Sequence, residues 1–197
     1  MRIDDFLGLL ASDLGNLAIC ERSIFSDEAW VLIENHPYDH IVKYNEFREF
    51  FGEKFKVTPK NICLTGSGKL GFSLDPDADF RPFNSEESDL DIVVVSSEIF
   101  EKFWTILLNA QYSWDLKLWS GHHLNVFRKF VSFKPFKENR ITEIKEWNVK
   151  MGEIQSQFYV NFEIPNTLNY RFYRDWEAAH AYHCNGIEAL RRKHASQ

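Results

Sequence analysis

Residues 64–96 read LTGSGKLGFSLDPDADFRPFNSEESDLDIVVVS, and this stretch contains the pattern that determines the expected fold. A short apolar run ends in the pair Gly66-Ser67, and a second run, rich in β-branched residues, begins at Asp89 and Asp91. Short apolar runs bounded by turn residues are typical of buried strands. We therefore predict one strand before Gly66 and another strand that carries both aspartates.

The two aspartates form a candidate metal site. Asp89 and Asp91 are separated by one residue, so in a strand both carboxylates point to the same face, with Cα atoms roughly 6–7 Å apart. Two like charges about 4 Å apart repel by roughly 4 kcal/mol at an effective dielectric constant near 20, unless a cation bridges them. The pair therefore predicts Mg²⁺ (or Mn²⁺), which binds carboxylate oxygens, water and phosphates. The alternative is a solvated strand end without a metal.

The Gly-Ser turn is a candidate phosphate site. A glycine directly after a buried strand lets a ligand approach the backbone closely. Ser67 offers a hydroxyl and exposed N–H groups to a phosphate, and Lys69 adds a positive charge nearby. The turn is not a Walker motif, because G-x-x-x-x-G-K-[ST] does not occur in the sequence. Gly66, Ser67 and Lys69 are therefore candidate nucleotide-binding residues, and an ordinary turn is the alternative.

Together, LTGSGKLG with its Gly66-Ser67 pair and SDLDIVVV with Asp89 and Asp91 resemble the nucleotidyltransferase superfamily. That superfamily includes DNA polymerase β, cGAS-like enzymes and the small minimal nucleotidyltransferases. Its members share a strand that ends in Gly-Ser, a short helix, and a strand with Asp-x-Asp. The resemblance covers residues 60–110 and implies an α/β (α+β) fold, with a small mixed sheet flanked by helices and helical elements at both ends of the chain.

The resemblance also implies an activity. The expected reaction is transfer of a nucleoside monophosphate from an NTP or dNTP to a hydroxyl acceptor, with release of pyrophosphate. Asp89 and Asp91 would bridge two Mg²⁺ ions, and Glu163 would serve as the third carboxylate. Asn161 shares the expected polar face with Glu163 and is the alternative occupant of that position. An asparagine there would make the protein a degenerate module that binds a nucleotide or a partner protein.

The segment between the two motifs is unusually long for this resemblance. Twenty-one residues, 68–88, separate Ser67 from Asp89, which is more than compact members of the superfamily have. We interpret SLDPDADFRPFN as an insertion. It forms either a flap in which Arg81 or Phe83 touches phosphate or base, or an ordinary surface loop.

Composition indicates a globular chain and argues against a basic coat for nucleic acid. Hydrophobic residues make up 44% and aromatic residues 16%, and the net charge is −6. Coating a phosphate backbone requires clustered Lys and Arg. We expect one domain over 1–197, with a helical N-terminal part (1–56), a catalytic core (60–165) and a closing helix (166–197). The three cysteines lack paired metal spacing.

The remaining elements follow from apolar spacing. The expected helices cover 6–17, 39–55, a segment capped by Ser96 or Ser97, 122–133, 141–155 and 167–193, with a Lys- and Arg-containing loop at 134–140. The alternation in FYVNFEI predicts a strand over 158–164 that would carry Glu163.

Other functional classes have weaker support in the sequence. The pairs His122-His123 and His180/His183 lack the Cys, Asp or Glu that would complete a metal set. Aromatic and arginine residues alternate in 171–192 and could stack on a nucleic acid, but a closing helix with a basic end explains them more simply.

The expected location is the cytoplasm. The first 20 residues contain Asp4, Asp5 and Asp13 and lack the apolar core of a signal peptide, and no apolar run is long enough to cross a bilayer. The short chain is similar to compact enzymes of bacterial anti-phage defence and toxin–antitoxin systems. The acceptor would be a nucleotide, a protein or an RNA, and a partner effector or toxin protein is expected.

Overall fold

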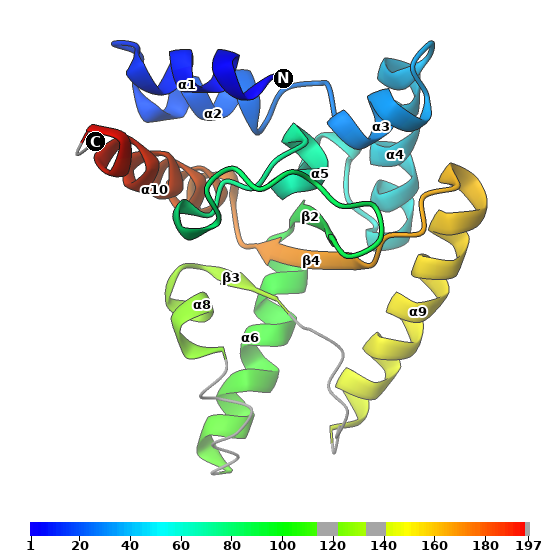
Figure 1. Cartoon of the computed structure of the whole chain (residues 1–197). Coiled ribbons are helices and arrows are strands. Elements are labelled where there is room, and N and C mark those ends of the chain that lie inside the picture. The colour runs from blue at the N-terminus through cyan, green and yellow to red at the C-terminus, as the bar shows by residue number, and fades with distance from the viewer. Residues whose placement is uncertain (114–121, 133–140, 196–197) are drawn as a thin grey trace.

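A computed structural model of the chain describes residues 1–113, 122–132 and 141–195. They form a mixed α and β protein in which helices surround one four-stranded sheet (Figure 1). The strands are β1 (Ile62–Thr65), β2 (Leu90–Val95), β3 (Phe130–Val131) and β4 (Leu168–Tyr173). The helices are α1 (Ile3–Ala11), α2 (Asn16–Ser23), α3 (Trp30–Asn35), α4 (His40–Phe55), α5 (Gly66–Leu70), α6 (Ser97–Tyr112), α8 (His123–Phe127), α9 (Thr142–Phe162) and α10 (Trp176–Ala195), with 3₁₀ turns η1 (Pro59–Asn61) and η2 (Pro76–Ala78).

The strand order places the two sequence motifs side by side. The order is β1-β2-β4-β3, with β1 antiparallel to β2, β4 parallel to β2, and β3 antiparallel to β4. The end of β1 therefore meets the starts of β2 and β4 at one edge of the sheet. Thr65 pairs with Asp91, and Asp91 pairs with Asn169. The strand predicted before Gly66 is confirmed. The second predicted strand is confirmed from Leu90 onward, so it carries Asp91, whereas Asp89 lies one residue before it.

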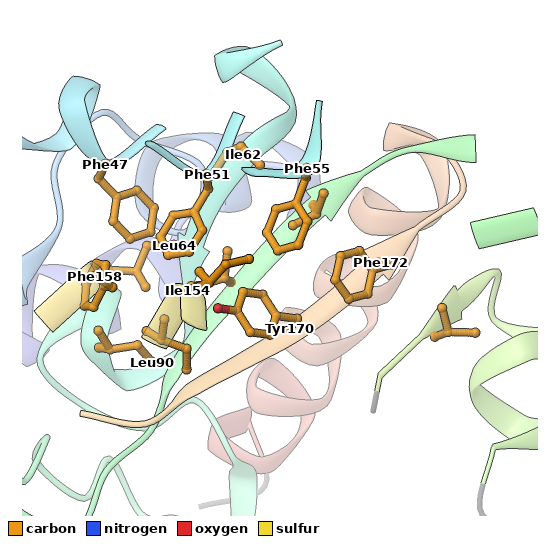
Figure 2. Packing of buried hydrophobic residues seen from close by; sticks show 14 of the residues in the cluster. Phe47, Phe51, Phe55, Ile62, Leu64, Leu90, Ile154, Phe158, Tyr170 and Phe172 are labelled. Atoms are coloured by element: carbon orange, nitrogen blue, oxygen red, sulfur yellow. The ribbon is translucent and has the colours of Figure 1, made fainter. Parts of the chain in front are cut away.

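One face of the sheet is closed by aromatic rings from α4, α6 and α9. Phenylalanines four residues apart on α4 share one side of that helix and point to the sheet, as the 39–55 prediction expected. Figure 2 shows them against rings from α9 and β4. Phe51 is fully buried, with ring centroids 5.6 Å from Phe158 and 6.1 Å from Tyr170. Such tilted and edge-on contacts are favoured by the ring quadrupoles.

The opposite face is covered only in part, by α10. Ala178 and Ala179 lie against Cys63, Val93 and Tyr173 on the strands. Small side chains let the helix approach the sheet closely. Helices α1 and α2 pack on the outer side of α10 (Figure 1). The part of this face that α10 leaves uncovered contains the acid pair.

The strand predicted over 158–164 is wrong. These residues form the last turn of α9, which ends at Phe162, and the two residues that follow it. Phe158 and Phe162 are buried together with Ile154, at four-residue spacing, whereas Val160 is 77% exposed. The alternation of apolar residues therefore coincided with a helical stripe, because positions i and i+4 satisfy both periods.

The closing helix predicted over 167–193 is correct only from Trp176 onward. Residues 168–173 form β4, the strand paired with β2. Leu168, Tyr170 and Phe172 are buried on the aromatic face, while Asn169 and Arg171 are half-buried on the other. The two faces of β4 have different neighbours, and this tertiary context outweighs the helical spacing of the aromatic residues.

The other predictions are met to different degrees. The helix expected over 6–17 is divided into α1 and α2, and α3 was not expected. Ser96 caps α6, since its hydroxyl accepts a hydrogen bond from the Ile99 amide. The segment 122–133 contains the short α8 followed by β3. The loop expected at 134–140 lies outside the described residues.

Among the helices of the described ranges, none has both the length and the hydropathy needed to cross a membrane.

Candidate functional site

A large cleft opens where β1, β2 and β4 meet the loop 71–89 and α10. Its volume is about 1590 Å³. The sheet contributes Thr65, Asp91, Asn169 and Arg171 to its lining, and the start of α5 contributes Gly66 and Ser67. Asp89 lines the same cleft from the residue before β2. The structure therefore brings the Gly-Ser turn and both aspartates into one concave site.

Gly66 and Asp91 are in direct contact. Gly66 has a φ of +69°, in the left-handed region that favours glycine. A Cβ built at this position would lie 2.3 Å from the Asp91 Oδ2 atom. Any other residue would therefore push the carboxylate away and strain the backbone. Glycine is required here to let the Asp91 carboxylate lie against the end of β1.

Asp89 is held by an amide from the neighbouring strand. The Asn169 Nδ2 atom donates a hydrogen bond to the Asp89 Oδ2 atom at 2.7 Å. Because β4 runs parallel to β2, Asn169 is in register with Asp91. One asparagine thus lies beside both carboxylates of the pair and fixes the position of one of them.

Arg171 is the cation nearest to the pair in the sheet. Its Nη2 atom is 3.7 Å from the Asp91 Oδ1 atom, and its guanidinium lies 5.2 Å from the centre of the Tyr182 ring on α10. Burial lowers the pKa of the Arg171 guanidinium, but the Asp91 carboxylate and two neighbouring tyrosines raise it, and the net direction is upward. Arg171 is therefore a permanent positive charge that is held from two sides.

His183 on α10 contributes a neutral ring to the lining of the cleft. Its side chain is 9% exposed, and its Nε2 atom is buried without a hydrogen-bond partner in the described part of the chain. Burial, followed by the positive charge of Arg171, lowers the pKa of His183 to about 3. The imidazole is consequently neutral near pH 7, where it can accept or donate one hydrogen bond.

Lys69, a predicted nucleotide-binding residue, is directed away from the cleft. Its ammonium donates to the backbone oxygen of Ser26 and lies 4.6 Å from the centre of the Tyr44 ring. The residue is 2% exposed, and burial lowers its pKa to about 8. Lys69 thus binds the N-terminal helices to α5, and its charge does not reach the lining of the cleft.

Glu163, the predicted third carboxylate, is not on a strand. It follows the last residue of α9, with a left-handed φ of 56°. It is not among the residues that line the cleft, and neither is Asn161, whose amide bonds to the Gln157 carbonyl within α9. The residue beside the acid pair on the neighbouring strand is Asn169. Neither residue predicted for the third position, Glu163 or Asn161, therefore lies in the cleft.

The 68–88 segment forms one wall of the cleft. Phe72 bridges to Pro82, so the segment folds back on itself as a narrow loop. Phe72 and Phe80 pack on Phe6 of α1, which anchors the loop to the N-terminal helices. Arg81 is exposed and lines the cleft, as its predicted role requires. The segment is thus a surface loop with a fixed base, and it borders the acid pair.

Three further residues surround the acid pair. Asn169 was missed by the sequence prediction, and Arg171 and Tyr182 were weighed only within the stretch 171–192, for which a closing helix with a basic end was preferred. All three lie in the segment that was interpreted as one helix. The signal that would have found the first two is the alternation in Leu168–Tyr173, where apolar residues occupy every second position and polar ones lie between.

The donor set suits one divalent cation. Two half-buried carboxylates, Asp89 just before β2 and Asp91 in β2, face the same cleft, and the absent side chain of Gly66 leaves the space that Asp91 occupies. Oxygen ligands of this kind, completed by water and phosphate, are what Mg²⁺ binds. Within the described ranges, no group of three or more His, Cys, Asp or Glu residues could hold a metal. A second ion therefore lacks a third carboxylate there.

Comparisons with protein-family models, with curated proteins and with solved structures found no match. The residues and geometry of the cleft are therefore the basis of the function proposed below.

Proposed function

We propose that this protein is a metal-dependent nucleotidyltransferase that moves a nucleoside monophosphate from an NTP or dNTP to a hydroxyl acceptor. The observation that carries the proposal is the contact between Gly66 and Asp91, with Asp89 in the same cleft. This contact puts a carboxylate pair beside a turn whose backbone a phosphate can approach. A purely structural Asp-x-Asp would not need a glycine fitted to one of its carboxylates.

The sheet supports the same proposal. The resemblance in the sequence implied a small mixed sheet flanked by helices, with Gly-Ser and Asp-x-Asp on successive strands. Strands β1 and β2 are antiparallel neighbours, so the two motifs meet at one edge. The short α5 begins directly at Gly66. Its first N–H groups have no carbonyl partner within the helix, and in this proposal the donor phosphates approach this turn.

The residues around the acid pair have distinct roles in this proposal. Asp89 and Asp91 hold the cation, which supplies neutralisation of charge on the donor phosphates. Ser67 presents its hydroxyl to the β- and γ-phosphates, and Arg81 approaches them from the loop wall. The Asn169 amide keeps Asp89 in one orientation. The protein thus contributes mainly positioning and electrostatic stabilisation.

The size of the cleft is consistent with two substrates. Pockets for one small ligand usually measure about 300–1,000 Å³, and this cleft has about 1590 Å³. A nucleoside triphosphate would leave room beside α10 for an acceptor. Tyr182 of α10 faces that space with its ring already under the Arg171 guanidinium.

The test is a transfer assay with every α-³²P-labelled NTP and dNTP, in the presence of Mg²⁺ or Mn²⁺, with all labelled products resolved. We expect label transfer and release of pyrophosphate by the wild type. The transfer rate should fall at least about 100-fold in Asp91→Asn, because the variant loses a metal ligand and the metal's stabilisation of the transition state is worth several kcal/mol. Asp39→Asn is the matched control, because Asp39 is exposed and lies outside the cleft. Full activity in Asp91→Asn would contradict the proposal. The labelled product also identifies the acceptor as nucleotide, protein or RNA.

A second candidate function is a module that binds a nucleotide without transferring it. Asn169 and Arg171 favour it, because both stand on the strand next to the acid pair where a further carboxylate was expected. Calorimetric titration with a non-hydrolysable NTP, combined with the transfer assay above, distinguishes the two. Metal-dependent binding without transfer to any acceptor supports the module, and transfer excludes it.

A further inference from the structure

On the β4 side of the acid pair, the described residues are an amide and a guanidinium. Asn169 donates to Asp89, and Arg171 forms an ion pair with Asp91. We propose that the cleft holds one divalent cation and that Arg171 takes the place of a second, binding the donor phosphates directly. This inference rests on the proposed nucleotide-binding function and specifies how that function is performed.

The fixed positive charge of Arg171 disfavours a second cation beside Asp91. Asp89 and Asp91 contribute two negative charges, Arg171 contributes one positive charge, and the Asn169 amide is neutral. A second divalent ion bound to Asp91 would lie close to the Arg171 guanidinium, which forms an ion pair with the same carboxylate. The ion and the guanidinium would repel each other.

Arg171 is arranged to bind an anion. Its side chain is 27% exposed and lines the cleft, so a ligand can reach it. At 3.7 Å, its contact with Asp91 is an ion pair that is longer than a hydrogen bond. The Tyr182 ring supports the guanidinium from the α10 side within cation–π range. A guanidinium matches phosphate oxygens with two parallel N–H donors, which an ammonium does not.

The inference predicts affinity for nucleotide without metal. The wild type should bind a non-hydrolysable NTP measurably in EDTA, and Arg171→Gln should weaken that binding roughly 10- to 100-fold, as for a hydrogen bond to a charged group. The same substitution should strengthen Mn²⁺ binding, because Asp91 loses its competing cation. If Arg171 served only the stability of the fold, Arg171→Gln would not weaken NTP binding while strengthening Mn²⁺ binding.

The test combines calorimetry with counting of bound Mn²⁺ from its paramagnetic resonance signal, at saturating non-hydrolysable NTP. We expect one Mn²⁺ per chain in the wild type and two in Asn169→Asp, which adds a carboxylate in register with Asp91. Mn²⁺ should also raise the melting temperature of Asn169→Asp more than that of the wild type, because the variant binds a second ion. Arg174→Gln is the matched control, since Arg174 pairs with Glu101 outside the cleft.

The outcomes separate this inference from the proposed function. Two Mn²⁺ per wild-type chain, or metal-free NTP affinity that is unchanged in Arg171→Gln, would overturn the inference while the transfer proposal stands. Absence of both NTP and Mn²⁺ binding by the wild type would overturn both. If Arg171→Gln does not fold, Arg171→Lys replaces it. That variant keeps the charge but loses the paired donors, so its metal-free affinity should still fall.

Discussion

The two faces of the sheet differ in what they contribute to the protein. On β4, Tyr170 and Phe172 point into the aromatic layer, whereas Asn169 and Arg171 point into the cleft. Neighbouring residues of one strand therefore belong to the buried aromatic cluster and to the charged cleft. Because side chains alternate along a strand, two of four consecutive residues stabilise the core and the other two line the cleft. This separation predicts that substitutions on the two faces will have different consequences.

The largest expected effect is on the aromatic face. Phe51→Ala removes a fully buried ring and should lower the free energy of unfolding by about 3–5 kcal/mol, as other buried Phe→Ala changes do. Tyr159→Ala is the matched control, since that ring is 54% exposed and its loss should change stability by less than about 0.5 kcal/mol. Denaturant unfolding measures both. Equal effects would show that the aromatic layer is not the main source of stability.

The next effect is on the cleft face, where stability and binding should change together. Gly66→Ala places a Cβ against Asp91 at a left-handed φ, which should cost roughly 1–3 kcal/mol of stability and displace the carboxylate. NTP affinity should fall at least about tenfold, the equivalent of 1.4 kcal/mol. The control is Gly152→Ala on α9, where a Cβ meets nothing within 4 Å and helix propensity predicts stabilisation of about 1 kcal/mol. Unchanged NTP affinity in Gly66→Ala would separate the Gly-Ser turn from the site.

The smallest expected effect concerns Lys69, which adjoins the cleft in sequence but not in space. Lys69→Met should leave NTP affinity unchanged within about twofold and change stability at pH 7 by no more than about 1 kcal/mol, since the lost hydrogen bond offsets the removed buried charge. A clear loss of NTP affinity would return Lys69 to the phosphate site.

The same variant tests the pH dependence of stability. The pKa of Lys69 is about 8 in the fold, compared with 10.5 for the free side chain. The unfolded chain therefore binds more protons between these values, and the contribution of Lys69 to stability increases as pH rises from 8 to 10.5. Thermal unfolding across this window should show a smaller rise in Lys69→Met than in the wild type. Identical slopes would contradict the burial of this ammonium.

Much of the cleft could be predicted from the sequence, because its signals are local. Gly66, Ser67, Asp89 and Asp91 follow from two short motifs at the ends of apolar runs, and β1 and β2 follow from the same runs. The outcome for Lys69 depended on where its side chain turned. Only the fold shows that the Ser26 carbonyl is within its reach.

The boundary between α9 and β4 could not be placed because two periods overlap there. Phe158 and Phe162 satisfy both a strand and a helix, and the aromatic residues of β4 recur at spacings that extend the pattern of α10. The pairing of β4 with β2 resolves the ambiguity, and this contact joins residues about 80 positions apart. As a direct consequence, Asn169 was missed and Arg171 was assigned to the basic end of a helix.

The most direct test of the claim that the acid-pair face is the nucleotide site is hydrogen exchange, measured by mass spectrometry with and without Mg²⁺ and a non-hydrolysable NTP. The account predicts slower exchange in the peptides that cover 65–70 and 88–92, and no change in the amides of α4 and α9. Protection confined to α4 and α9, or no protection at 65–70 and 88–92 when the NTP is bound, would contradict it.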